Sequence, residues 1–476
     1  MPIRPQGYSL CKDATSSSVP TLSQPPASTR LPAHLPLYHR LLFPHHPLGE
    51  PLPQLVIGNG PEIDLLNERI YNLVALALRG YILSWYTRFS KDRALVPSIH
   101  STIIHPILSP ILTSVYDNPE RVMKWILRDL LCSVEIHVKV YWQAKAALGA
   151  GTLGDRYHAR LPLPSVTASS SLAPHSPVDP TYTLSPEYLT SLSVALIQPT
   201  ETEEERPQMG LQGLMIREVL ARAILAGGMR RICLGWFWYG LILKLLGEPG
   251  DPFPWRRTTP QKQDEPESLH QLVLSYTRTI ISLFTTIYSA IVALIAVYTA
   301  APPPSPEYEG CTDTLMGMIR EILGVDGYAG IEAKKWRKRT VWGGVEMVVG
   351  LTSPVLDRII SHLLSSQLTS KLSFRLIDLA ERILFPLDGY PGPTPIDPTP
   401  DEAADMRDKA EKRIGEIIPK PLRVIFCPED KDVSRLMEWM SDAGCNAHLV
   451  GMMLVSLVAT LLPDLVDKTN SEDGQL

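Results

Sequence analysis

The chain has 476 residues, with 45 lysines and arginines against 50 aspartates and glutamates, a formal net charge of -5 at pH 7. This balance argues against a dedicated nucleic-acid binder, which normally carries a basic excess. Hydrophobic residues make up 45% of the chain and prolines number 44. Such a composition excludes a wholly disordered chain and predicts helices separated by Pro-rich connections.

The first 36 residues are rich in Pro, Ser and Thr. They contain too few apolar residues to offset the entropy of ordering them, so we predict a disordered tail there and a second one at residues 467–476. The N-terminal stretch has no apolar segment typical of secretion signals. The six cysteines stand singly, without a CxxC pair. We therefore expect a reduced protein that faces the cytosol and has no structural zinc.

Apolar residues recur at three- and four-residue steps along residues 62–89, which predicts a long amphipathic helix. Strand signals are almost absent. The predicted fold class is therefore all-α, with further helices in residues 98–115, 120–148, 186–197 and 210–225. Long connections rich in Pro and Ser separate the helical segments, at residues 161–186, 247–268, 302–310 and 385–400.

A helix over residues 400–418 is predicted from its N-terminal residues. Thr399 is a good N-cap residue, and Pro400 suits the first helical position. Asp401 and Glu402 favour the positive end of the helix dipole.

One enzyme motif matches by letter, since GAGTLG at residues 149–154 fits the GxGxxG pattern. A dinucleotide fingerprint needs a strand before the glycines, whereas a helical pattern precedes them here, and we interpret the segment as a loop that ends a helix. No GxSxG, HExxH, P-loop or EF-hand motif is present, and the histidines are scattered. We predict a non-enzymatic protein with no catalytic residue, no metal site and no cofactor.

Two segments are more apolar than a small core requires. Residues 232–246 read ICLGWFWYGLILKLL, and residues 279–301 contain no charge. The second segment is long enough to cross a bilayer, which takes about 20 apolar residues. Six serines and threonines dilute it, however, and such hydroxyls can hydrogen-bond within a helix in either setting. Both a transmembrane helix and a buried helix or cavity wall fit this composition.

The chain has one dense basic run. Basic residues beside aromatic ones suit an anionic lipid surface on the cytosolic side of a membrane. A solvated helix with Trp336 packed inward is the alternative. The candidate membrane-surface residues are Lys334, Lys335, Trp336, Arg337, Lys338 and Arg339.

Two parts of the chain resemble known domains. LLNERIYNLVALALRGYILSWYTRFSKD at residues 65–92 and IREVLARAILAGGMRRICLGWFWYGLILKLLG at residues 216–247 resemble the first and last helices of the PX-associated (PXA) domain. Residues 379–426 and 445–465 resemble the C-terminal domain of sorting nexins. The order of both regions, without a PX or RGS domain between them, is similar to the fungal type of PXA protein.

The resemblance implies an all-helical protein in which the two regions pack together around an apolar groove. The implied domains are a PXA domain at 37–247, central helices with Pro-rich loops at 248–370 and a nexin-C-like region at 371–466. The implied activity is lipid binding or transfer, with a phospholipid or fatty acyl chain, a membrane surface and trafficking proteins as partners, and no nucleic acid. The implied location is the cytosolic face of the endoplasmic reticulum, endosome or vacuole, as a peripheral protein.

If the two end regions pack together, they lie on one side of any membrane, and a single span at residues 279–301 would separate them. We therefore expect that segment to be buried in protein or to line a lipid cavity. A tether or sorting scaffold without lipid transfer remains the alternative function. The candidate cavity residues are the bulky side chains of the two apolar segments, namely Trp236, Phe237, Leu241, Phe284, Ile287, Ile291 and Ile295.

Overall fold

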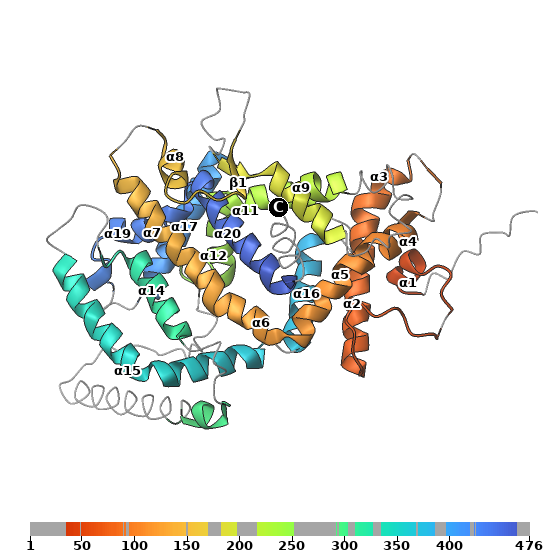
Figure 1. The fold of residues 1–476 in the computed structure, drawn as a ribbon, viewed down its shortest axis with the longest axis horizontal. Coiled ribbons are helices and arrows are strands. Elements are labelled where there is room, and N and C mark those ends of the chain that lie inside the picture. The colour runs from red at the N-terminus through yellow and green to blue at the C-terminus, as the bar shows by residue number, and fades with distance from the viewer. Residues whose placement is uncertain are drawn as a thin grey trace, which may run out of the picture.

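The computed structural model describes residues 35–47, 49–88, 90–91, 95–148, 151–169, 182–197, 217–251, 292, 295–302, 310–326, 335–367, 370–385, 397–418, 423 and 425–463. Within these ranges the regular structure is helical apart from one small hairpin, which confirms the all-α fold class (Figure 1). The two predicted tails lie almost wholly outside the described residues.

The N-terminal third consists of helices and of helical segments with π-type hydrogen bonding. They are α1 (Leu37–Leu42), α2 (Pro61–Ala77), η1 (Leu78–Leu83), α3 (Ser84–Tyr86), α4 (Leu95–Ile99), η2 (His100–Ile104), α5 (His105–Asp117), α6 (Pro119–Lys124), η3 (Trp125–Leu130) and α7 (Leu131–Ala146). The helix predicted at residues 62–89 is found as α2, η1 and α3 in succession.

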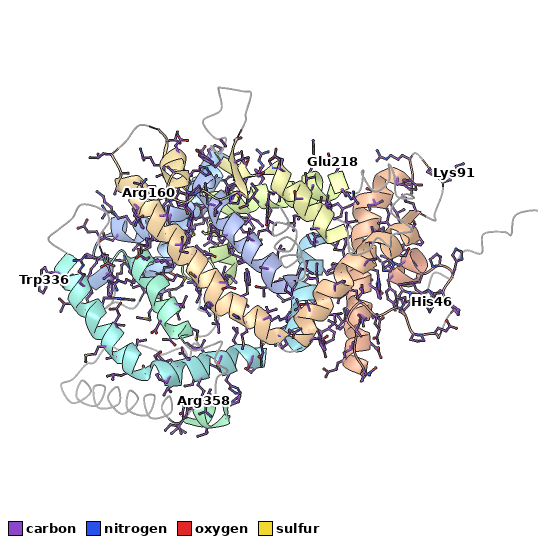
Figure 2. All side chains as sticks on the ribbon, viewed as in Figure 1. His46, Lys91, Arg160, Glu218, Trp336 and Arg358 are labelled. Carbon is purple, nitrogen blue, oxygen red and sulfur yellow. The ribbon has the colours of Figure 1, made fainter. Side chains whose placement is uncertain are left out.

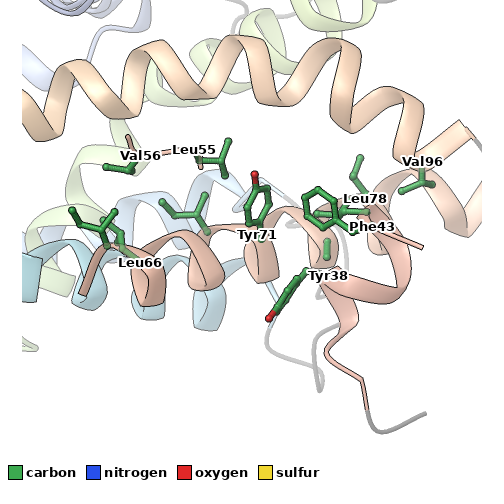
Figure 3. Packing of buried hydrophobic residues seen from close by; sticks show 12 residues of the cluster. Tyr38, Phe43, Leu55, Val56, Leu66, Tyr71, Leu78 and Val96 are labelled. Atoms are coloured by element: carbon green, nitrogen blue, oxygen red, sulfur yellow. The ribbon is translucent and has the colours of Figure 1, made fainter. Parts of the chain in front are cut away.

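A first core lies between α2 and the loop that precedes it (Figure 3). Tyr71 is fully buried there, and its ring meets that of Phe43 edge-on at 5.0 Å. Asn67 fixes the loop, because its side-chain oxygen accepts hydrogen bonds from the backbone NH groups of Leu55 (3.1 Å) and Val56 (2.8 Å). The apolar face of α2 is thus covered by α1 and the loop that precede it, and also by Val96 of α4 and Phe374 of α16.

The middle of the chain contains the hairpin and a second group of helices. Antiparallel pairing places Val166 of β1 opposite Leu184 of β2. The GxGxxG segment follows α7 and leads into α8 through a capping box of Thr152 and Asp155, so no strand precedes it. The elements are α8 (Leu153–His158), β1 (Val166–Ala168), β2 (Tyr182–Leu184), α9 (Pro186–Ile197), η5 (Val219–Ala226), α11 (Gly227–Cys233) and α12 (Gly235–Leu246).

The C-terminal part begins with two helices that contact each other, α14 and α15, and ends with α20, which packs on α7 and α11. The predicted helix at 400–418 is found as α17, with Thr399 in a capping box with Glu402. The elements are α14 (Cys311–Leu323), α15 (Lys335–Gln367), α16 (Ser370–Leu384), α17 (Pro400–Ile417), α19 (Asp430–Leu436), η8 (Glu438–Met440) and α20 (Ala443–Leu461).

Helices from the two ends of the chain share a core (Figure 1). α20 packs on α7 and α11, α17 packs on α12, and α16 packs on α2. The side-chain amide of Asn446 donates to the carbonyl oxygens of Cys233 (2.9 Å) and Met440 (2.7 Å). The N-terminal helices therefore depend on the C-terminal ones for much of their burial.

Candidate lipid-binding site and membrane surface

α12 is anchored at both ends and along one face. Asn446 binds the carbonyl oxygen of Cys233 just before the helix. At the other end Arg413 donates to the carbonyl oxygen of Leu246, where a positive charge suits the negative end of the helix dipole. Tyr239 is buried in the core shared with α17. The helix is therefore held in place by the C-terminal region.

The opposite face of α12 is only partly covered. Phe237, Leu241 and Leu245 follow at four-residue steps and so share one face of the helix. Phe237 is half-buried, whereas Leu241 is 36% exposed and Leu245 65% exposed. We name these three residues the α12 stripe, an apolar surface that the described residues leave open to solvent.

The predicted cavity residues fall into three groups. Trp236 and Phe237 are half-buried neighbours, with ring centroids 6.5 Å apart, and Leu241 lies one turn further along α12. Ile295 is 55% exposed on a short helical segment beside α15, where Arg358 contacts the ring of Tyr298. The other three lie outside the described residues, namely Phe284, Ile287 and Ile291. The described structure therefore brings together only the α12 residues.

The basic run lies at the N-terminus of α15. Trp336 is 68% exposed and points away from the body at one end of the molecule (Figure 2). Arg337 and Arg339 are exposed as well, and Lys338 is half-buried. Lys334 and the side chain of Lys335 lie outside the described residues. The outward position of Trp336 differs from the alternative in which it packs inward.

α15 is attached to the protein along its length. Near its start, Trp342 is buried and its ring meets that of Phe426 edge-on at 6.2 Å. Glu346 accepts hydrogen bonds from Trp342 (2.7 Å) and from Arg320 of α14 (3.0 Å). Further along, Asp357 accepts a hydrogen bond from the backbone NH of Thr312 at the start of α14 (2.8 Å). α15 therefore runs antiparallel to α14.

An exposed apolar surface in the middle of α15 was not predicted from the sequence. Met347 is 67% exposed, Val348 58% and Leu351 77%. Trp336, Met347 and Leu351 are separated by eleven and four residues, which places them on one side of a helix. That spacing was available as a signal, but exposure depends on which face α14 covers.

Two described helices are long and apolar enough to cross a membrane by length and composition. They are Trp336–Ser366 within α15 and Ala443–Leu461. The most apolar window of α20 is 44% buried, as befits a core helix, whereas that of α15 is only 17% buried.

A charged cavity of about 580 Å³ lies between α7, α14 and α15. Arg320 forms ion pairs with Asp326 and Glu346, and its hydrogen bonds lower the pKa of Asp326. Such a lining does not suit acyl chains, because hydrocarbon in the cavity would remove the charged side chains from water. Its other lining residues are Glu135, Lys139, Asp313, Met316, Gly317, Glu321, Val349 and Gly350.

Buried histidines connect α7 and α8 with α20. Nδ1 of His137 lies 2.8 Å from the hydroxyl of Tyr157, and Nδ1 of His158 lies 2.9 Å from Nε2 of His448. Burial lowers the pKa of both His137 and His448 to about 4. Among the described residues no group of three or more His, Cys, Asp or Glu side chains could hold a metal ion. With their pKa values lowered, His137 and His448 are neutral groups that pack and form hydrogen bonds in this core.

These features define an all-helical protein with exposed apolar side chains along α12 and α15. Comparison with known families is more specific, because the family model of the PXA domain matches residues 64–245. This stretch runs from within α2 nearly to the end of α12 and so includes the α12 stripe. Residues 64–245 are thus a PXA domain. No curated protein and no solved structure matches the chain.

Proposed function

We propose that this protein is a non-enzymatic, membrane-associated lipid-binding protein that carries a lipid acyl chain on its PXA domain. The observation that carries the proposal is the α12 stripe. An apolar surface exposed on a helix that is otherwise anchored in the core is typical of an interaction site. An acyl chain laid along it gains about 0.8 kcal/mol for each buried methylene group, and no catalytic group is needed.

The remaining parts of the proposal follow from the resemblance of the chain ends. The C-terminal helices correspond to a sorting-nexin C-terminal region, in a protein of the fungal PXA type. The protein transfers lipid as a peripheral membrane protein on the cytosolic face of the endoplasmic reticulum, endosome or vacuole. Its partners there are trafficking proteins. The packing of α16, α17 and α20 on PXA helices supports a single lipid-binding body.

Native mass spectrometry of the purified protein tests lipid binding. We expect a co-purified lipid in the wild type, and its loss in the double variant Leu241→Gln, Leu245→Gln. Because Leu245 is 65% and Leu241 36% exposed, the substitutions should lower the unfolding midpoint only slightly. Leu65→Gln is the matched control, since Leu65 is 46% exposed on α2.

A tether or sorting scaffold is the second candidate function. It is favoured by the aromatic core in which Tyr141 and Trp142 of α7 lie in one buried cluster with Trp439 of η8. A wild-type protein that carries no lipid in the same experiment would support the scaffold and contradict the carrier.

A further inference from the structure

The exposed side of α15 is apolar over a long distance. Trp336, Met347, Val348 and Leu351 are each more than half exposed, at 68%, 67%, 58% and 77%. We name these four residues the α15 stripe. Apolar side chains gathered on one exposed helix face mark a surface that contacts a partner or a membrane.

The α15 stripe is uncharged, although the helix begins with basic residues. Between Arg339 and Asp357 the sequence contains one charged residue, Glu346. Its side chain is 42% exposed, but its carboxylate is held toward α14 and Trp342 by hydrogen bonds from Arg320 (3.0 Å) and Trp342 (2.7 Å). No charge on the helix itself therefore opposes contact between the stripe and an apolar phase.

The contacts between α15 and α14 limit how α15 can be oriented relative to a membrane. Its first half is held by Trp342 and Glu346, and its second half by Asp357, which caps the start of α14. Both halves lie against α14, so α15 cannot cross a bilayer while α14 stays outside. A helix held in this way can meet a membrane only from the side, as interfacial helices do.

The charges at the start of α15 indicate which surface the stripe meets. Arg337 is exposed beside Trp336 at the end of the stripe, and Arg339 is exposed as well, although it is paired with Asp326 at 3.6 Å. Trp favours the level of the lipid headgroups, and Arg and Lys are attracted to anionic lipids. A protein partner would need an apolar groove flanked by acidic side chains. An anionic leaflet offers an apolar interior and negatively charged headgroups together.

We infer that the α15 stripe is the membrane-facing surface of this protein and docks side-on onto an anionic lipid leaflet. The inference rests on the proposed membrane association and adds the surface that carries it. Met347, Val348 and Leu351 enter the acyl boundary, while Trp336 and the basic residues beside it stay among the headgroups. α14 and the charged cavity lie behind the helix, on the side away from the leaflet.

Flotation with vesicles of phosphatidylcholine, with or without phosphatidylserine, tests the inference on the full chain. The wild type should float with the anionic vesicles, and less so as salt rises, because the screening length shortens. Met347→Gln with Leu351→Gln should lower partitioning at least tenfold. Arg337→Glu with Lys338→Glu should lower it about fivefold per residue at low salt.

Leu376→Gln with Leu379→Gln is the matched control. These leucines are 55% and 53% exposed on α16, and their replacement should leave flotation unchanged. Equal binding of the Met347, Leu351 variant and the wild type would overturn the assignment of α15, while lipid found by native mass spectrometry would still support the proposed function. A wild-type dimer in light scattering that the same variant dissociates would also overturn it, in favour of a second copy of the chain.

Discussion

Arg413 is a fully buried cation that connects α17 to the end of α12. Its guanidinium donates to the carbonyl oxygens of Leu246 (2.9 and 2.6 Å) and Asp251 (2.9 Å), and it forms an ion pair with Glu416. Arg413→Ala leaves these carbonyl oxygens without their guanidinium donor and removes the ion pair with Glu416. We expect the free energy of unfolding to fall by about 2 to 4 kcal/mol, measured by urea denaturation.

Lys409→Ala is the matched control on the same helix, because the Lys409 ion pair with Asp405 is exposed to solvent. Its unfolding midpoint should stay close to that of the wild type. Arg413→Lys should recover little stability, since an ammonium cannot reproduce the planar fork of a guanidinium. Full recovery by lysine would show that charge alone matters at this position.

The buried histidines predict a dependence of stability on pH. Burial lowers the pKa of His137 and of His448 to about 4, while the unfolded chain has a histidine pKa of about 6.5. The unfolded state therefore binds more protons between these values, so stability is complete above about pH 6.5 and is lost as the pH falls toward 4. Urea titrations should show a loss on the order of 3 kcal/mol for each histidine.

His448→Gln should flatten this pH profile without removing it. His137 remains, and burial also lowers the pKa of His100 in the N-terminal core to about 4. A slope between about pH 6.5 and 4 that is equal in His448→Gln and the wild type would contradict the assignment.

At the residue scale the sequence revealed little about these groups. Arg413 lies in a charged helix whose pattern predicts a solvated face, and His137 is one of several scattered histidines. Their burial comes from partners far away in the chain, such as the carbonyl oxygens of Leu246 for Arg413 and of Trp439 for His137. Local periodicity contains no information on such contacts.

At the element scale α14 has an N-terminal cap that another helix supplies. Asp357 of α15 accepts hydrogen bonds from the backbone NH groups of Gly310 (2.9 Å) and Thr312 (2.8 Å) and from the hydroxyl of Thr312. Burial raises the pKa of the Asp357 carboxyl, but these bonds outweigh that effect and the pKa is lowered. One carboxylate of α15 therefore caps the start of α14.

Asp357→Ala should destabilise the protein by about 1 to 3 kcal/mol, because it leaves buried NH groups unpaired. Hydrogen exchange should rise at the first amides of α14. Thr399→Ala is the comparison, because Thr399 caps its own helix α17 on the surface. This substitution should lower the free energy of unfolding by about 0.5 to 2 kcal/mol, with faster hydrogen exchange only in α17. Unchanged exchange in α14 would contradict the capping role of Asp357.

The two helices also show what could be predicted from sequence at this scale. α17 was predicted from its cap and first turn, because those signals are local and the structure uses them unchanged. The short strands β1 and β2 were not predicted, since three residues are too few for an alternating pattern and the hairpin is held by packing on α20. The exposed face of α15 required knowledge of where α14 packs.

At the scale of the whole molecule, the PXA domain is not covered by its own residues alone. Val138, Tyr141 and Trp142 of α7 pack against Met437, Trp439 and Leu449 from the C-terminal helices. Without those helices this apolar face of α7 would be exposed to water, at a cost of about 1.5 to 3 kcal/mol for each large side chain. Folding of residues 64–245 is therefore coupled to the C-terminal region.

The complementary fragments 1–251 and 252–476 test this coupling. We expect fragment 1–251 to aggregate or to unfold without a cooperative transition when it is expressed alone, because its α7 face has no cover. Co-expression with fragment 252–476 should restore a soluble one-to-one complex, since α17 and α20 can then pack on α12 and α7. The chain shortened to residues 35–463 is the control and should unfold like the wild type. Two fragments that each unfold cooperatively, and do not associate when mixed, would instead show two independent domains and would separate the PXA domain from the C-terminal helices that anchor the α12 stripe.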